Sequence, residues 1–114
     1  FNPKYQLTQM WINRMKAKEY NPVHVHPFCD LSFNLWLEVP QRMLDEAKKK
    51  ETNAANPGSI SFYYGEDTWS VLSEQHFAPR VNTLMMFPAT LRHQVMHFNS
   101  KVIRTSVAGN IKFV

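Results

Sequence analysis

Histidines occur in this chain at a spacing that suits a metal ion. His24 and His26 are two residues apart in the stretch 21–30. Alternate side chains of an extended chain project to the same face, so both imidazoles can reach one point. Histidine is the commonest metal ligand among side chains, but it is also frequent on wet strand faces, and the pair alone leaves both interpretations open.

A facial site for a divalent ion needs a third ligand. His93 is the best candidate, because a strand ends before it and a Phe-Pro turn leads up to it. His97 and His76 compete for this role, although a lone histidine is more often structural or exposed. Asp30 follows the histidine pair closely and is predicted to be a fourth ligand or a partner that orients one imidazole.

An arginine and a hydroxyl farther along the chain form a candidate carboxylate clamp. Arg104 stands eleven residues after His93, and Ser106 follows two residues later. On a strand these two side chains face the same way, and a guanidinium binds a carboxylate through two parallel hydrogen bonds. The competing interpretation is a surface arginine that pairs with any nearby acid.

Strand-like segments make up most of the chain that positions these residues. They cover 7–15, 31–39, 59–64, 69–77, 83–87, 94–98 and 102–108, and the last can extend to 113. In the first segment the alternation places one set of side chains toward a polar cavity, namely Leu7, Gln9, Trp11, Asn13 and Met15. Asn21-Pro22 is predicted to form a turn before the histidine pair.

The segment 41–55 carries the only clear run of helix-forming residues. Met43, Leu44 and Ala47 are spaced three and four apart, and lysines follow in the last turn. Asn56-Pro57-Gly58 then breaks the helix. We expect one short helical insertion within 41–56, which is also a candidate lid or partner surface.

The predicted architecture is an all-β, cupin-like jelly roll with a single domain over 1–114. A chain of 114 residues supports one hydrophobic core. About eight short strands with one helical insertion are typical of two packed antiparallel sheets. An open α/β sheet would need helices alternating with strands, and only one helix is predicted.

Composition narrows the class of protein. Hydrophobic residues make up 44% of the chain, above the range in which disorder is the default. The chain has no run of eighteen apolar residues and one cysteine, Cys29, so we expect no membrane span and a cytoplasmic setting. The net charge of +4 permits attraction to polyanions, but Lys48, Lys49 and Lys50 supply much of it and are typical of a solvated face. Nucleic-acid binding is therefore the lesser interpretation.

Several motifs together carry a resemblance to a known family. They are Trp11-x-Asn13, Glu19-Tyr20-Asn21-Pro22 before His24-x-His26, Leu31-Ser32-Phe33 in a segment that ends Val39-Pro40, Phe87-Pro88 before His93, and Arg104-x-Ser106. In this order they resemble the 2-oxoglutarate- and Fe(II)-dependent oxygenases, particularly short prolyl-hydroxylase-like members from phages and marine bacteria. The resemblance spans nearly the whole chain, and only the lysine-rich insertion departs from it.

The resemblance implies a double-stranded β-helix in which His24, the residue two later and His93 bind Fe(II). It also implies that Arg104 and Ser106 hold the distal carboxylate of 2-oxoglutarate. The side chains expected to reach this co-substrate as well are Asn13 and Asn34. The implied function is a dioxygenase that hydroxylates a protein side chain or a small molecule.

Two features keep alternatives open. Most of that superfamily has an acid where this chain has His26, so the site has either three histidines or a carboxylate from Asp30. The spacing His-x-His-x3-Asp also resembles the first metal motif of cupins, which favours a metalloenzyme without a keto acid as an alternative. A non-catalytic jelly-roll binding module is the third hypothesis. Arg104 discriminates between the first two, and a homodimer stays open.

Overall fold

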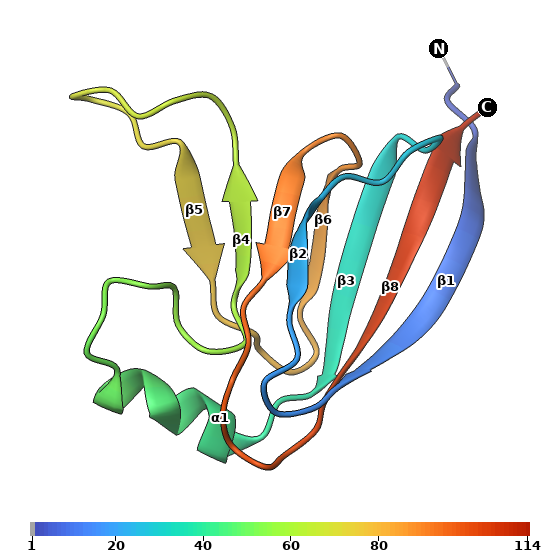
Figure 1. The fold of residues 1–114 in the computed structure, drawn as a ribbon. Helices are drawn as coiled ribbons and strands as arrows, with labels where there is room; N and C mark the ends of the chain where they lie inside the picture. Colours follow the sequence, from blue (N-terminus) through green and yellow to red (C-terminus); the bar gives the residue numbers. More distant parts are fainter. Residues whose placement is uncertain (1) are drawn as a thin grey trace.

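Two four-stranded antiparallel sheets form the molecule, and the chain crosses repeatedly from one to the other (Figure 1). The computed structural model describes residues 2–114. Its strands are β1 (Tyr5–Met15), β2 (Asn21–His24), β3 (Leu31–Glu38), β4 (Ile60–Tyr63), β5 (Glu74–Phe77), β6 (Leu84–Pro88), β7 (Arg92–Val95) and β8 (Arg104–Phe113). The strand orders are β1-β8-β3-β6 and β2-β7-β4-β5. This confirms the predicted all-β jelly roll.

Strand β8 is central to the larger sheet and sets its register. It pairs with β1 on one side and β3 on the other, both antiparallel. Residues that share a row across β1, β8 and β3 are Asn13–Ser106–Trp36, Trp11–Ala108–Asn34 and Gln9–Asn110–Ser32. Because side chains alternate along a strand, these rows point to one face, and that face turns toward the smaller sheet.

A β-bulge in β1 corrects one sequence prediction. Leu7 was expected on the same face as Gln9, but the register shifts between them, so that Leu7 pairs with Ile111 while Gln9 pairs with Asn110. The extra residue, Thr8, donates its hydroxyl hydrogen to the main-chain oxygen of Asn110 at 3.2 Å. Leu7 therefore lies on the opposite face from Gln9, as expected when a bulge inserts one residue into a strand.

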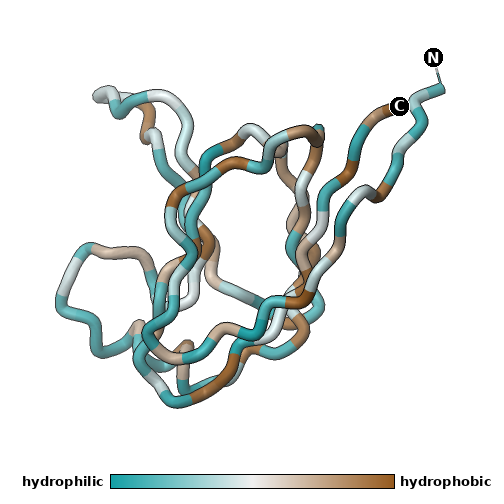
Figure 2. Tube along the Cα trace, turned by 45° about the vertical axis from the view of Figure 1, so that its right-hand side comes forward, coloured by the Kyte–Doolittle hydropathy of each residue, from teal (hydrophilic) through white to brown (hydrophobic). Residues whose placement is uncertain are grey.

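The helical insertion is shorter than predicted. Helix α1 spans Gln41–Asp45, a 3-10 turn η1 continues over Glu46–Lys49, and the helix does not reach residue 55. Met43 is fully buried against the end of the barrel, whereas no apolar spacing continues beyond Ala47 to hold a longer helix. In Figure 2, which views the two walls of the barrel from another side, the insertion is mostly hydrophilic.

The insertion is anchored to the loop between β7 and β8. The carboxylate of Glu46 accepts hydrogen bonds from the main-chain nitrogens of Asn99 and Ser100 at 2.8 and 2.9 Å, and from the Ser100 hydroxyl at 2.6 Å. Met43 packs with Met15 and Phe98 in one of two buried clusters. A small apolar contact and one carboxylate thus fix the segment.

Three boundaries also differ from the sequence predictions. Asn21-Pro22 begins strand β2 and is not a turn, and β7 covers Arg92–Val95 where 94–98 was predicted. The expected strand from 69 to 77 begins only at Glu74, and Trp69 is 98% exposed. The carboxylate of Asp67 accepts the main-chain hydrogen of Ser73, so a local turn satisfies the backbone there.

The second buried cluster lies between the two sheets. It consists of Trp36, Ile60, Phe62 and Phe87.

No helix within residues 2–114 is long and apolar enough to span a membrane.

Candidate metal centre

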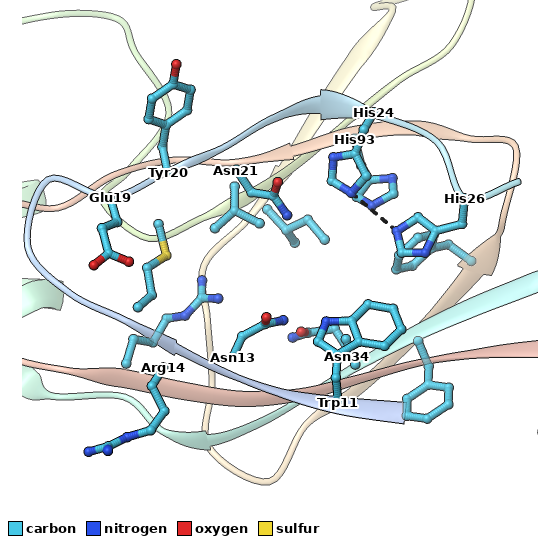
Figure 3. Close-up of a pocket in the computed structure, with 17 residues that line it drawn as sticks. Trp11, Asn13, Arg14, Glu19, Tyr20, Asn21, His24, His26, Asn34 and His93 are labelled. Atoms are coloured by element: carbon cyan, nitrogen blue, oxygen red, sulfur yellow. Dashed lines mark hydrogen bonds between the residues drawn. The ribbon is translucent and has the colours of Figure 1, made fainter. Parts of the chain in front are cut away.

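Three histidines converge at the mouth of the barrel (Figure 3). His24 ends β2 and is the register partner of His93 in β7, while His26 lies in the loop that follows β2. One nitrogen from each ring lies within 4.8 Å of the others, and the Nε2 atoms of His24 and His26 are 3.2 Å apart. The pairing of β2 with β7 is what joins residues that are far apart in the sequence.

The outer nitrogens of two rings are held by main-chain carbonyls. The Nδ1 atom of His24 lies 2.6 Å from the oxygen of Pro22, and Nδ1 of His93 lies 2.9 Å from the oxygen of Leu91. A carbonyl oxygen only accepts hydrogen bonds, so Nδ1 of each ring carries the proton. The lone pair of each Nε2 is therefore free to bind a metal ion.

His26 is placed by a side chain, by ring stacking and by its own backbone. Its Nδ1 lies 2.8 Å from Oδ1 of Asn110. Its ring stacks on Trp11 with centroids 5.9 Å apart and an interplanar angle of 19°. Its main-chain nitrogen donates to the oxygen of Ala89 at 2.9 Å, which ties the loop to the turn before β7. Three separate contacts thus hold a ligand that lies outside regular structure.

Burial favours the neutral, metal-binding form of two of these rings. Desolvation lowers the pKa of His93 to about 4, against a smaller opposing effect of its hydrogen bond to Leu91. Desolvation also lowers the pKa of His26, while its hydrogen bond to Asn110 acts in the other direction. At neutral pH a proton therefore competes weakly with a metal ion for these nitrogens.

Asp30 lies outside the group of converging ligands that the described residues form. Its carboxylate accepts a hydrogen bond from the main-chain nitrogen of Phe113 at 2.7 Å, and its main-chain nitrogen donates to Ile111 at 2.9 Å. Asp30 thus joins the start of β3 to the end of β8. The donor set that the structure assembles contains imidazoles and no carboxylate.

A cavity of about 290 Å³ extends inward from the histidines. Its volume is at the lower end of the range for small-molecule pockets, about 300–1,000 Å³. Its walls include all three histidines, with Trp11, Asn13, Phe33, Asn34, Phe87, Val95 and Arg104. Figure 3 shows Asn13 and Asn34 on the wall opposite the histidines, next to each other. Imidazoles, the amides of Asn13 and Asn34 and the guanidinium of Arg104 thus share a single cavity, whose lining also includes Arg14, Glu19 and Asn21.

Arg104 provides the buried positive charge of the cavity. Its side chain is 3% exposed, and Nη1 donates to the main-chain oxygen of Gly58 at 3.1 Å. Burial lowers its pKa to about 10, so it remains a cation at neutral pH. Its Nε is buried without a hydrogen-bond partner, and within residues 2–114 no carboxylate forms a salt bridge with it. An anionic ligand would satisfy both deficits.

Two further buried donors lie one row away from Arg104. The Ser106 hydroxyl and the Trp36 indole nitrogen lack hydrogen-bond partners within the described chain, and the two residues are register partners across β8 and β3. Ser106 is fully buried and does not line the cavity, so of the predicted clamp only Arg104 reaches it. Each unpaired buried donor costs about 1–3 kcal/mol, which is unusual outside functional sites.

Sequence reasoning missed the residues that support His26. Asn110 was detectable, because it has the same parity on β8 as Arg104 and Ser106. Ser32, which contacts the Asn110 side chain, carried no separate signal. The Trp36 nitrogen was also missed, since an aromatic residue in a strand is more often core.

The two competing histidines lie elsewhere. His76 shares a hydrogen bond of 2.6 Å with Ser61 and lies 3.7 Å from the carboxylate of Glu74. His97 is exposed, beyond the end of β7. Neither belongs to the converging group that the described residues form.

A family model and a solved structure match this chain. The family model described as "Putative 2OG-Fe(II) oxygenase" matches residues 9–110. A crystal structure of an oxidoreductase of the 2OG-Fe(II) oxygenase family from Burkholderia pseudomallei superposes with a TM-score of 0.69 at 18% sequence identity. The superposition covers 98% of this chain and 47% of that protein, so this chain spans about half of its length. Among curated proteins no match was found.

Proposed function

The chain belongs to the 2OG-Fe(II) oxygenase family, and from this premise we propose that it is a dioxygenase that hydroxylates a protein side chain or a small molecule. Three imidazoles whose Nε2 lone pairs can bind a metal ion lie at one end of a cavity, and the same cavity contains a buried guanidinium that has no carboxylate partner within residues 2–114. This arrangement is the observation that carries the proposal. The first group suits a divalent metal, and the second suits a dicarboxylate that reaches the metal with its other end.

The donor set fits Fe(II). Nε2 of His24, His26 and His93 would hold the ion, since the Nδ1 atoms are all engaged in hydrogen bonds. Imidazole is a suitable ligand for iron, and three protein ligands on one side leave positions open for co-substrates. When bound, Fe(II) supplies the chemistry by which dioxygen and 2-oxoglutarate become succinate and carbon dioxide while one oxygen atom enters a C–H bond of the substrate.

Arg104 is the proposed anchor of 2-oxoglutarate. Its free Nε, beside an Nη1 fixed by Gly58, leaves one edge of the guanidinium for a carboxylate. Asn13 and Asn34 would donate amide hydrogens from the wall opposite the histidines. Ser106 is buried on the same face of β8 as Arg104, outside the cavity lining, and would support Arg104 from within the core. The apolar parts of the wall, including Phe87 and Val95, limit the water around the bound co-substrate.

A second, wider hollow supports an entry route for the substrate. It has a volume of about 710 Å³ and shares Trp11, His24 and His26 with the inner cavity. Its lining contains no Asp, Glu, Lys or Arg among the described residues. The fully exposed ring of Phe28 lies at its edge with a positive φ of 62°, a strained conformation for a bulky residue. We infer that the part of the substrate that enters here is uncharged.

An anaerobic titration tests the proposal. Fe(II) and then 2-oxoglutarate are added to the purified chain, and a weak visible charge-transfer band is expected only when both are present. His93→Ala should abolish the band, whereas His97→Ala, a matched control at an exposed histidine, should leave it unchanged.

Two results would overturn the proposal in different ways. If metal binds but neither absorbance nor calorimetry detects 2-oxoglutarate, a cupin-like metalloenzyme without a keto acid replaces it. If no divalent metal binds, both enzyme functions fail.

A further inference from the structure

His26 differs from the other two histidines in how its tautomer is fixed. His24 and His93 donate to main-chain oxygens, which no point mutation removes. The partner of His26 is the Oδ1 atom of Asn110, a side chain that is 4% exposed and 2.8 Å away. One ligand of the three therefore depends on a residue that can be changed.

Two further hydrogen bonds accompany the observed orientation of the Asn110 amide. Its Nδ2 donates to Oε1 of Gln9 at 2.7 Å, and its Oδ1 accepts from the hydroxyl of Ser32 at 2.9 Å. Ser32 is 1% exposed, so water does not replace this donor. With Nδ2 donating and Oδ1 accepting, His26 must present Nδ1–H to Asn110 and its Nε2 lone pair to the other histidines.

Three neighbouring strands supply the residues of this network. Gln9, Asn110 and Ser32 form one row across β1, β8 and β3. Gln9 lies on the inner face in continuous register with Trp11 and Asn13, and the bulge before it turns Leu7 to the opposite face. Residues of three strands thus converge on the outer nitrogen of one imidazole.

The network is also electrically neutral. A metal-bound histidine commonly donates to a carboxylate, which raises the basicity of the ligand. Here the acceptor is an amide, and its own partners are an amide and a hydroxyl. A divalent ion at this site would therefore meet no negative protein charge from the converging ligands or from the partner of His26.

We propose that Asn110 is a positioning residue that fixes the metal-binding tautomer of His26 and, because it is uncharged, leaves the full charge of the ion to attract the anionic co-substrate. This inference rests on the proposed function, since it assumes that the three histidines bind a metal. It predicts opposite effects for two replacements of Asn110, one that removes the acceptor and one that adds charge.

The test uses Co(II) as a probe with visible d–d absorption, followed by 2-oxoglutarate. Asn110→Leu removes the acceptor, so Co(II) affinity should fall about 10- to 100-fold, the usual effect of losing such a partner. Asn110→Asp keeps an acceptor, and the Gln9 amide can turn to donate to it. Co(II) should then bind at least as tightly as in the wild type, while 2-oxoglutarate should bind the Co(II)-loaded chain about tenfold more weakly.

Thr8→Val is the matched control, because Thr8 donates to the main-chain oxygen of Asn110 and not to its side chain. It should leave Co(II) affinity and the d–d spectrum unchanged. Gln9→Leu releases the Asn110 amide without touching His26 and should weaken Co(II) binding less than Asn110→Leu does. This second variant keeps the test decisive if Asn110→Leu does not fold.

The inference is overturned if Asn110→Leu or Gln9→Leu folds and binds Co(II) with unchanged affinity and spectrum. It is also overturned if Asn110→Asp binds 2-oxoglutarate as tightly as the wild type does. A wild-type chain that binds no Co(II) at all would instead refute the proposed function on which the inference rests.

Discussion

Replacing Arg104 with methionine should weaken co-substrate binding and stabilise the free protein at the same time. Methionine matches the length of the arginine stem and carries no charge. In the free chain Arg104 is 3% exposed, and its guanidinium has one hydrogen bond, to Gly58, with no carboxylate partner within residues 2–114. A buried charge that lacks a counter-ion is costly, and it persists where a ligand supplies the missing charge.

The magnitudes follow from these contacts. Removing one partner of a buried ion pair costs about 3–5 kcal/mol, so the dissociation constant of 2-oxoglutarate should rise roughly 100- to 5,000-fold. In the free chain, relief of the desolvated charge outweighs the lost hydrogen bond to Gly58, which is worth about 1 kcal/mol. We expect a net gain of about 1–2 kcal/mol in the free energy of unfolding and a rise of several degrees in Tm.

Two assays measure the two effects separately. Anaerobic calorimetry with Mn(II)-loaded protein gives the 2-oxoglutarate affinity, and thermal unfolding of the metal-free chain gives the stability. Arg104→Lys is the comparison variant, since it keeps the charge but loses the planar fork, and it should recover only part of the affinity. The reasoning is refuted if Arg104→Met destabilises the free chain while 2-oxoglutarate binds as before.

Three further changes test the frame around the site. Gly58→Ala should lower the unfolding free energy by about 1–3 kcal/mol, since the residue has φ of +71° and an added Cβ would lie 2.8 Å from Sδ of Met43; chemical denaturation checks this. Glu46→Gln should cost about 1 kcal/mol at neutral pH. Burial raises the pKa of Glu46, but hydrogen bonds from Ser100 and Asn99 hold it below its usual value of 4.5. In denaturation experiments this difference should therefore begin to shrink as the pH falls below 4.5 and should vanish only below the folded-state pKa, where the carboxylate takes up a proton. Adding Zn(II) should raise the Tm of the wild type and not of His24→Ala.

Much of the fold was predictable from alternation and from turn residues. The segments 31–39 and 102–113 are rich in β-forming residues. They contain β3 and β8, the two inner strands of the larger sheet. The boundaries failed where side chains compete with the backbone. The carboxylate of Asp67 accepts the main-chain hydrogen of Ser73, and this local bond, which a hydrophobic pattern does not show, delays the start of the expected strand until Glu74.

The centre of the candidate site was predictable for a similar reason. Histidines two residues apart on extended backbone share a face, and Arg104 shares its parity with Ser106. The bulge in β1 was not predictable, because it arises from the pairing of Leu7 and Gln9 with β8 and leaves no local signature. The network around Asn110 emerged only from the structure, because it joins Gln9 and Ser32 on two other strands whose register the sequence does not show.

The most direct test of the account is anomalous diffraction from crystals grown anaerobically with Fe(II) and 2-oxoglutarate. The account predicts one iron peak bonded to Nε2 of His24, His26 and His93, with the distal carboxylate of 2-oxoglutarate on the guanidinium of Arg104. An iron ion bound through Asp30, or a keto acid bound away from Arg104, would contradict it.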